Sequence, residues 1–248
     1  MNDVYSYNSA FQAMAATGSV HAAQRIISAV RSILPVQSVL DVGCARGTWL
    51  RQWQAQGVAD LAGVDGDYVD RGKLEIDPRY FVVANLALPF NLGRRFDLAE
   101  CFEVAEHLPP ARAASFVADI VAHAPVVLFS AATPGQGGEH HVNEQPGEYW
   151  RQIFRSHDYV AVDCLRPLLM REPAIPAWYR YNMMMYVERG QLERINPFAR
   201  QFLLRDDQPM SDPAPLSYRL RKLMVRSLPR PLCDRLAQWN ARRIATSR

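Results

Sequence analysis

The feature that most constrains this chain is residues 39–49, where an apolar run ends in a loop of small residues and a helical pattern follows. Gly43 and Gly47 are spaced so that the backbone of the loop can approach a ligand closely. The first N–H groups of the next helix have no partner within that helix and would face the ligand. The segment therefore predicts a strand, a ligand-binding turn and a helix.

A second short apolar run, residues 61–65, ends in the carboxylate of Asp65, which suits the hydroxyl groups of a ribose. The first loop lacks the complete G-x-G-x-x-G pattern of a dinucleotide fold. Its Asp41 would also place a negative charge beside a pyrophosphate. A cationic, nucleotide-like cofactor meets no such repulsion, so the two runs together favour one.

The pattern Asp41-x-Gly43-x-Ala45-x-Gly47 resembles the first motif of class I S-adenosylmethionine (SAM) methyltransferases, and Asp65 matches their ribose-binding acid. Ala45 departs from the motif, because most members have glycine there. The resemblance implies an α/β, Rossmann-like fold with a mostly parallel seven-stranded sheet and helices on both faces. The cofactor-binding residues that it implies are Asp41, Gly43, Ala45, Gly47, Asp65, Asn85, Leu86 and Cys101. A similar strand and turn without a cofactor is the alternative.

Apolar runs and helical spacing alternate along the chain, which predicts a largely parallel sheet. The expected strands are 38–42, 61–65, 80–84, 97–101, 125–130, 159–165 and 182–187, and the expected helices include 20–34, 48–56 and 111–122. We divide the chain into an N-terminal helical segment (1–35), a SAM-binding methyltransferase domain (36–190) and a C-terminal extension (191–248). The extension combines a proline-rich linker with a basic, amphipathic helix pair that is interrupted by Pro229 and Pro231.

The chain has 248 residues and 49% hydrophobic content, enough for one sizeable α/β domain with additions. Its net charge of +3 is uneven, because residues 219–248 hold eight arginines and one lysine against the single acid Asp234. This tail could lie on anionic lipid, or could be a solvated helix that covers the main domain. Four cysteines without C-x-x-C spacing, and no leader or membrane-spanning pattern, favour a cytoplasmic protein, with peripheral contact at the inner membrane face as an option.

The segment 101–108 places two carboxylates and an imidazole close together in sequence. In a helical turn, Glu103, Glu106 and His107 would share one face and could bind a divalent cation. The segment resembles the Glu-x-x-Glu-His element of ubiquinone-pathway and small-RNA 2′-O-methyltransferases, where these positions hold a metal. That resemblance implies Glu103, Glu106, His107 and His141 as ligands of Mg²⁺ or another divalent cation. A capped helix start without a metal is equally compatible with the sequence.

A glycine-rich loop, residues 132–150, follows the fifth expected strand and contains His140, His141 and Glu144. Ligands of open α/β sheets bind beyond the carboxyl ends of the strands, so this loop and the segment 101–108 should meet in one crevice. We take His141, His140 and Glu144 as catalytic candidates. The alternative is that these residues have a purely structural role. Without a metal, His141 is the best general base, since the pKa of imidazole lies nearest neutrality.

The loop and residues 178–186 resemble bacterial class I methyltransferases found among glycan-biosynthesis enzymes. The leading function is therefore SAM-dependent O-methyl transfer to a hydroxyl of a glycan or sugar-containing small molecule. Methylation of an RNA ribose 2′-OH or of a quinone-like phenol is the alternative, although RNA would require a basic channel around the crevice rather than a basic tail. A non-catalytic SAM-binding scaffold is the alternative from another class. The acceptor and the oligomeric state are not specified by the sequence.

Overall fold

The computed structural model describes the backbone of residues 9–246 and the side chains of residues 19–229 and 231–239. Residues 1–8 of the expected N-terminal segment lie outside the described residues. The same holds for the side chains of Arg230, Arg242 and Arg243 in the basic tail.

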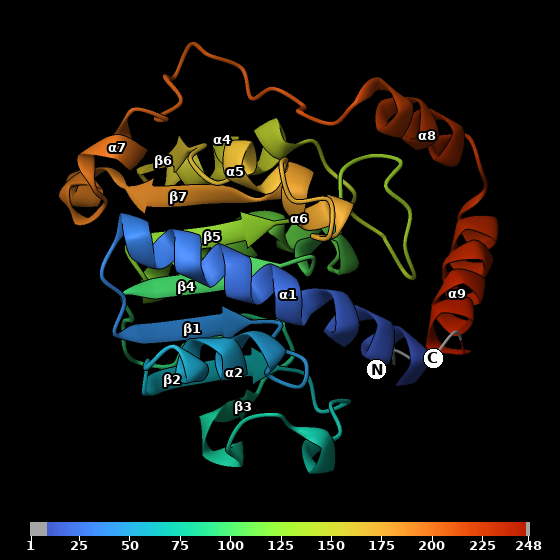
Figure 1. Cartoon of the computed structure of the whole chain (residues 1–248), viewed down its shortest axis with the longest axis horizontal. Coiled ribbons are helices and arrows are strands. Elements are labelled where there is room, and N and C mark those ends of the chain that lie inside the picture. Colours follow the sequence, from blue (N-terminus) through green and yellow to red (C-terminus); the bar gives the residue numbers. More distant parts are fainter. Residues whose placement is uncertain (1–8, 247–248) are drawn as a thin grey trace.

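Seven strands form one sheet in the order β3-β2-β1-β4-β5-β7-β6 (Figure 1). They are β1 (Ser38–Val42), β2 (Asp60–Asp65), β3 (Phe81–Val83), β4 (Leu98–Phe102), β5 (Val126–Ser130), β6 (Tyr159–Val162) and β7 (Met184–Glu188). Strands β1 to β5 pair in parallel, and β7 lies antiparallel between β5 and β6. Each expected apolar run overlaps one of these strands, with bounds that differ by a few residues, so the predicted Rossmann-like class I methyltransferase fold is confirmed.

Helices α1 to α7 lie on the two faces of the sheet, and α8 and α9 follow them in the chain. They are α1 (Ser9–Ile33), α2 (Thr48–Ala55), α3 (Ala113–His123), α4 (Gly147–Ser156), α5 (Arg166–Leu169), α6 (Ala177–Asn182), α7 (Pro197–Arg200), α8 (Leu216–Arg226) and α9 (Arg230–Thr246). Short 3₁₀ turns occupy Arg71–Lys73, Pro78–Tyr80, Ala105–His107, Pro110–Arg112 and Arg189–Arg194. No helix among the described residues is long and apolar enough to cross a membrane.

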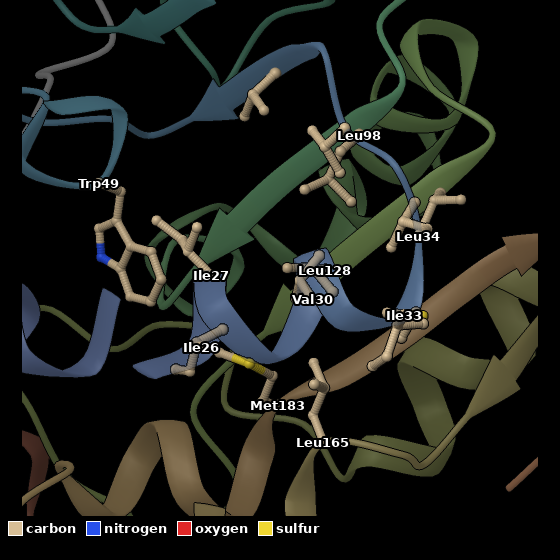
Figure 2. Close-up of a cluster of buried hydrophobic side chains, with 14 of the residues drawn as sticks. Ile26, Ile27, Val30, Ile33, Leu34, Trp49, Leu98, Leu128, Leu165 and Met183 are labelled. Atoms are coloured by element: carbon tan, nitrogen blue, oxygen red, sulfur yellow. The ribbon is translucent and has the colours of Figure 1, made fainter. Parts of the chain in front are cut away.

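Helix α1 shows why these residues form this layer. Its apolar side chains Ile26, Ile27, Val30 and Ile33 recur at helical spacing and are buried, as is Leu34 directly after the helix. Figure 2 shows them over Leu98 of β4 and Leu128 of β5. Burying each such side chain contributes about 1.5–3 kcal/mol. On the opposite face, α3 and α4 enclose a second cluster that includes Phe116, Phe129 and Phe154. The two clusters fix the sheet edge on which the site is built.

The core continues beyond residue 190, where we had placed the start of the C-terminal extension. Ile195 and Ala199 are 1% and 0% exposed, and Leu203 forms a bridge with Val162 of β6. Regular structure resumes at α8 and α9, the predicted helix pair, which is broken near Pro229. In Figure 1 both helices lie beyond the carboxyl ends of the parallel strands, and α9 runs beside the N-terminal part of α1.

A buried carboxyl group lies on the central strand β4. Glu100 is 0% exposed, and its Oε2 accepts a hydrogen bond from Trp53 Nε1 at 2.9 Å. Its Oε1 has no hydrogen-bond partner among the described residues. Burial, and then the charge of nearby Asp41, raise the pKa of Glu100 well above its usual value. The folded protein therefore holds this carboxyl group in its neutral form over a wider pH range than the unfolded chain does.

This shift predicts how Glu100→Gln changes stability with pH. A raised folded pKa means that stability is lost as pH rises from the unfolded pKa towards the folded one, by about 1.4 kcal/mol for each pH unit crossed. The amide cannot ionise, so the variant should gain stability relative to the wild type as pH rises from 5 to 8. Urea unfolding at both pH values measures this difference. The exposed control Glu193→Gln should show no such gain, and equal pH dependence of both variants would contradict the prediction.

Candidate active site

The turn after β1 requires glycine at two places. Gly43 and Gly47 have φ of +84° and +81°. A Cβ at Gly43 would lie 2.3 Å from a side-chain carbon of Val104, and one at Gly47 would lie 2.7 Å from Ile76. Gly43 lines the cavity, as expected, whereas Gly47 does not line it and instead lets the chain turn into α2. Glycine is thus used here both for its left-handed backbone and for the space it leaves.

Ala45 lies in the same turn with φ +46°, a left-handed conformation that costs an L-residue about 1–2 kcal/mol. A hydrogen bond offsets the cost, because the N–H of Ala45 donates to Asp65 Oδ2 at 2.7 Å. The family's usual glycine would adopt this conformation without strain.

Asp65 ends β2 and connects several parts of the site. Its Oδ1 accepts from the N–H of Gly66 at 2.7 Å and also from the hydroxyl of Tyr68. Burial raises the pKa of Asp65, although these hydrogen bonds act in the opposite direction. Asp65 lines the cavity at the place predicted for a ribose-binding acid.

Asp41 is a buried acid that faces the cavity with one oxygen unpartnered. Its side chain is 3% exposed, and Oδ2 has no hydrogen-bond partner among the described residues. Burial, followed by repulsion from Asp65, raises the pKa of Asp41 well above its usual value. A buried, unpaired carboxylate costs free energy unless a cation or donor approaches it. The site therefore favours a positively charged ligand group beside Asp41.

Asn85 and Leu86 also line the cavity to which the acid pair, Asp41 and Asp65, contributes. Their loop is held by Arg112, which sequence reasoning missed. Arg112 is 6% exposed, donates to the carbonyl groups of Leu86 (3.2 Å) and Leu88 (2.9 Å), and pairs with Asp119. Its burial depends on packing between distant segments, and no local sequence pattern signals such packing. Arg112 positions the loop from behind and does not line the cavity.

Cys101 does not contact the cofactor cavity, and this expectation was wrong. It is 0% exposed within the apolar cluster between the sheet and α3. Its position at the end of β4 suggested a cavity-lining residue, but side chains alternate between the two faces of a strand. The neighbouring Phe102 lines the cavity instead.

The glycine-rich loop brings His141 and Glu144 together. His141 Nδ1 lies 2.9 Å from Glu144 Oε1, and Glu144 accepts the N–H groups of Gly135 (2.7 Å) and Gly137 (2.9 Å). Burial by itself would raise the pKa of Glu144, but these hydrogen bonds lower it overall. The carboxylate thus stays charged and fixes the tautomer and orientation of His141. Glu144 itself stands behind the cavity wall, which His141 lines.

Glu106, His107 and His141 form the group of potential metal ligands among the described residues, with ligand atoms within 4.8 Å of one another. Glu106 is 0% exposed, and burial, then repulsion from Glu103, raise its pKa well above the usual value. The N–H groups of Glu106 and Ala132 act against this rise, yet neither carboxylate oxygen has a hydrogen bond of good geometry among the described residues. Burial lowers the pKa of His107 to about 3, so this imidazole is neutral.

Glu103 lies apart from that group, because residues 101–108 do not form the expected helical turn. Glu103 has φ +55°, and the 3₁₀ turn begins only at Ala105. Its carboxylate accepts from Gln136 Nε2 (2.6 Å) and Asn182 Nδ2 (3.3 Å) instead. Sequence reasoning missed both amides, which come from separate segments. The predicted shared face of Glu103, Glu106 and His107 is therefore wrong in its geometry.

His140, the third catalytic candidate, lines the cavity with φ +58°. Its N–H donates to Asp234 of α9 at 3.0 Å, and its carbonyl lies 3.3 Å from His107 Nδ1. The backbone of His140 thus connects the loop to the tail and orients His107. These contacts give it a structural role beside its neighbour His141.

One cavity of about 1640 Å³ joins the acid pair, Asp41 and Asp65, to a histidine cluster formed by His107, His140 and His141. Tyr218 and Arg221 of α8 and Trp239 of α9 also line it, together with Trp178 of α6. The basic tail is therefore part of the cavity wall, which agrees with the alternative of a helix that covers the main domain. An arrangement with a cation-binding acid pair at one end and an oriented imidazole at the other suits transfer of a group from a cationic donor.

Two of three comparisons with known proteins found similar proteins. A family model described as a methyltransferase domain matches residues 16–163. Curated protein sequences gave no match. Among solved structures, the sugar N-methyltransferase KedS8 from Streptoalloteichus sp ATCC 53650 is 17% identical, with 68% of this chain and 86% of that chain covered at a TM-score of 0.51.

Two further structures are similar. Magnesium protoporphyrin IX methyltransferase ChlM from Synechocystis PCC 6803, with bound SAM, is 15% identical over 75% of this chain and 86% of that chain, at a TM-score of 0.49. DesVI from Streptomyces venezuelae is 23% identical over 48% of this chain at a TM-score of 0.40, and the match spans only 54% of DesVI. The family match covers more than half of the chain: the protein belongs to the methyltransferase domain family and is a class I, SAM-dependent methyltransferase.

Proposed function

We propose that this methyltransferase transfers the methyl group of SAM to a hydroxyl group of a sugar or glycan. The observation that carries the proposal is the His141–Glu144 pair at the cavity. A hydroxyl group must lose its proton as its oxygen attacks, whereas a neutral amine attacks without a base. A carboxylate-oriented imidazole therefore supports an oxygen acceptor over a nitrogen acceptor.

His141 would act as the general base. When its Nδ1 donates to Glu144, Nε2 carries the lone pair that accepts the hydroxyl proton. A Cβ at Gly138 would lie 2.0 Å from this Nε2, so glycine is needed beside it. Transfer of the proton to Nε2 would let the acceptor oxygen attack the methyl group that SAM supplies, with S-adenosylhomocysteine as the leaving group. The charged Glu144 stabilises the imidazolium that forms.

The cofactor would lie along the acid pair. We assign Asp41, with Gly43 and Ala45, to the methionine end, where the unpartnered Oδ2 of Asp41 suits the cationic groups of SAM. Asp65 would bind the ribose hydroxyl groups. Asn85 and Leu86 would contact the adenine edge from the loop that Arg112 supports. Positioning of the donor and acceptor supplies much of the rate in such an in-line transfer.

A sugar acceptor fits the rest of the cavity wall. Trp178 and Tyr218 of this wall offer aromatic side chains, and Glu103 and Gln136 offer hydrogen-bonding groups. The cavity wall carries Asp67, Glu103 and Glu106 in addition to Asp41 and Asp65, against the two arginines Arg46 and Arg221, so it lacks the excess of basic groups that an RNA backbone would require. KedS8, a sugar N-methyltransferase with a similar fold, is consistent with a sugar acceptor in this architecture.

Metal-assisted transfer is a second candidate, favoured by the buried Glu106 carboxylate that lacks a hydrogen-bond partner among the described residues. Glu106, His107 and His141 provide one oxygen and two nitrogen atoms at close range, a set that suits a divalent cation. A bound cation would lower the pKa of the acceptor hydroxyl. His141 would then serve as a ligand, and Glu103 would take no part in the group.

Asp65→Asn tests the cofactor assignment. Loss of a charge-assisted hydrogen bond, worth about 1.5–3 kcal/mol, should weaken SAM binding by about tenfold to a hundredfold. Isothermal titration calorimetry measures the affinity, and circular dichroism checks the fold. Asp60→Asn, at the exposed start of the same strand, is the matched control and should bind SAM normally. Unchanged affinity in Asp65→Asn would remove Asp65 from the cofactor site.

His141→Gln tests the general base. Turnover of a sugar acceptor should fall by about 10²–10⁴-fold while the SAM dissociation constant stays within about twofold. Glu144→Gln should also lower kcat, because the neutral amide cannot stabilise the imidazolium. The exposed His157→Gln serves as control and should retain full turnover. Wild-type turnover by His141→Gln would exclude His141 as the base.

Chelation separates the two candidate mechanisms. If His141 is the base, turnover should continue after EDTA treatment, and elemental analysis should find less than about one tenth of a divalent ion per chain. If EDTA instead abolishes turnover and Mg²⁺ or Mn²⁺ restores it, the metal-assisted mechanism holds. His107→Gln would then lose both the metal and the activity.

A further inference from the structure

Helix α8 has two faces of different character. Tyr218, Arg221 and Val225 line the catalytic cavity. Leu216, Leu220, Leu223 and Met224 are 69%, 51%, 60% and 67% exposed. At 100° per residue these four side chains form one stripe on the side of the helix opposite the cavity. No described element of the chain covers this stripe.

Helices α8 and α9 carry many basic residues, of which Arg221 lines the cavity and Lys222 pairs with Asp212 at 2.7 Å. Between residues 216 and 239 the chain has the basic residues Arg219, Arg221, Lys222, Arg226, Arg230 and Arg235. The one acid in this range, Asp234, already accepts the N–H of His140. Helical spacing places Arg219 and Arg226 beside the apolar stripe, and both are exposed. Exposed Leu232 adds apolar surface on α9, whereas Leu236 and Trp239 of that helix line the cavity.

We propose that the outer face of α8 docks on an anionic membrane surface. An apolar stripe flanked by arginines is the pattern of a helix that lies in the interface plane, with leucines among the acyl chains and arginines at the phosphates. Two copies of this chain would bring their basic residues together across a symmetric interface, which opposes self-association through α8. The charge therefore selects a negative partner, and the unbroken apolar stripe selects lipid.

This placement has a consequence for the reaction that rests on the proposed function. Since one face of α8 lines the cavity and the other would contact lipid, the membrane would lie about 10 Å, one helix diameter, from the cavity wall. A sugar attached to a lipid would thus reach the site without leaving the membrane. Membrane binding itself does not depend on which acceptor is methylated, so the two proposals can fail separately.

Vesicle flotation with the full chain tests the proposal. The wild type should bind phosphatidylcholine vesicles that contain about 30 mol% phosphatidylglycerol, because these vesicles have an anionic surface. It should bind vesicles of pure phosphatidylcholine only weakly. Leu220→Glu/Leu223→Glu should lower binding at least about tenfold. Arg219→Gln/Arg226→Gln should lower it about thirtyfold and flatten its dependence on salt.

The matched control is Leu168→Glu/Met170→Glu, which adds the same two charges at exposed apolar residues near α5 and should bind like the wild type. SAM affinity confirms that each variant is folded. Equal vesicle binding by the Leu220→Glu/Leu223→Glu variant and the wild type would overturn the proposal. Wild-type dimers that dissociate in this variant, without vesicle binding by either protein, would also overturn it and assign the stripe to a second copy.

Discussion

The hydrogen bond from Ala45 to Asp65 connects the two strands on which the cofactor site is built. One oxygen of the carboxylate holds the turn after β1 in a left-handed conformation, while the other holds Gly66 and Tyr68 after β2. Without this acid, a non-glycine residue would have less reason to occupy that conformation. The shape of the cofactor end therefore depends on a group that we also propose to bind the ribose.

Buried acids at the carboxyl edge of the sheet explain why the site suits a cationic donor. Asp41, Asp65 and Glu106 are all nearly inaccessible to solvent, and burial raises the pKa of each. Such an arrangement opposes ionisation in the empty protein. A positively charged ligand offsets part of the cost of ionising these carboxyl groups, so the site favours a cationic ligand over a neutral or anionic one.

The C-terminal tail links the cavity to the outer surface. Contacts of α8 and α9 with the glycine-rich loop, such as Arg221 to the carbonyl of Gln136 and Gln238 to Glu139, hold the tail over the histidine cluster. The leucines of α8, Leu216, Leu220 and Leu223, point outward, away from the cavity. Catalytic and docking roles can therefore occupy one short helix, because the 3.6-residue period separates the two sets of side chains.

The sequence by itself determined the strands, the long helices, the glycine turn and the acid Asp65, because apolar periodicity and glycine spacing act over a few neighbouring residues. It also singled out His141 and Glu144 as neighbours in one loop. Only the tertiary structure decided that Glu103 turns away to Gln136 and Asn182, that Cys101 faces the core, and that Arg112 supports a distant loop. These outcomes depend on contacts between segments far apart in the chain, and no local pattern encodes which of them will meet.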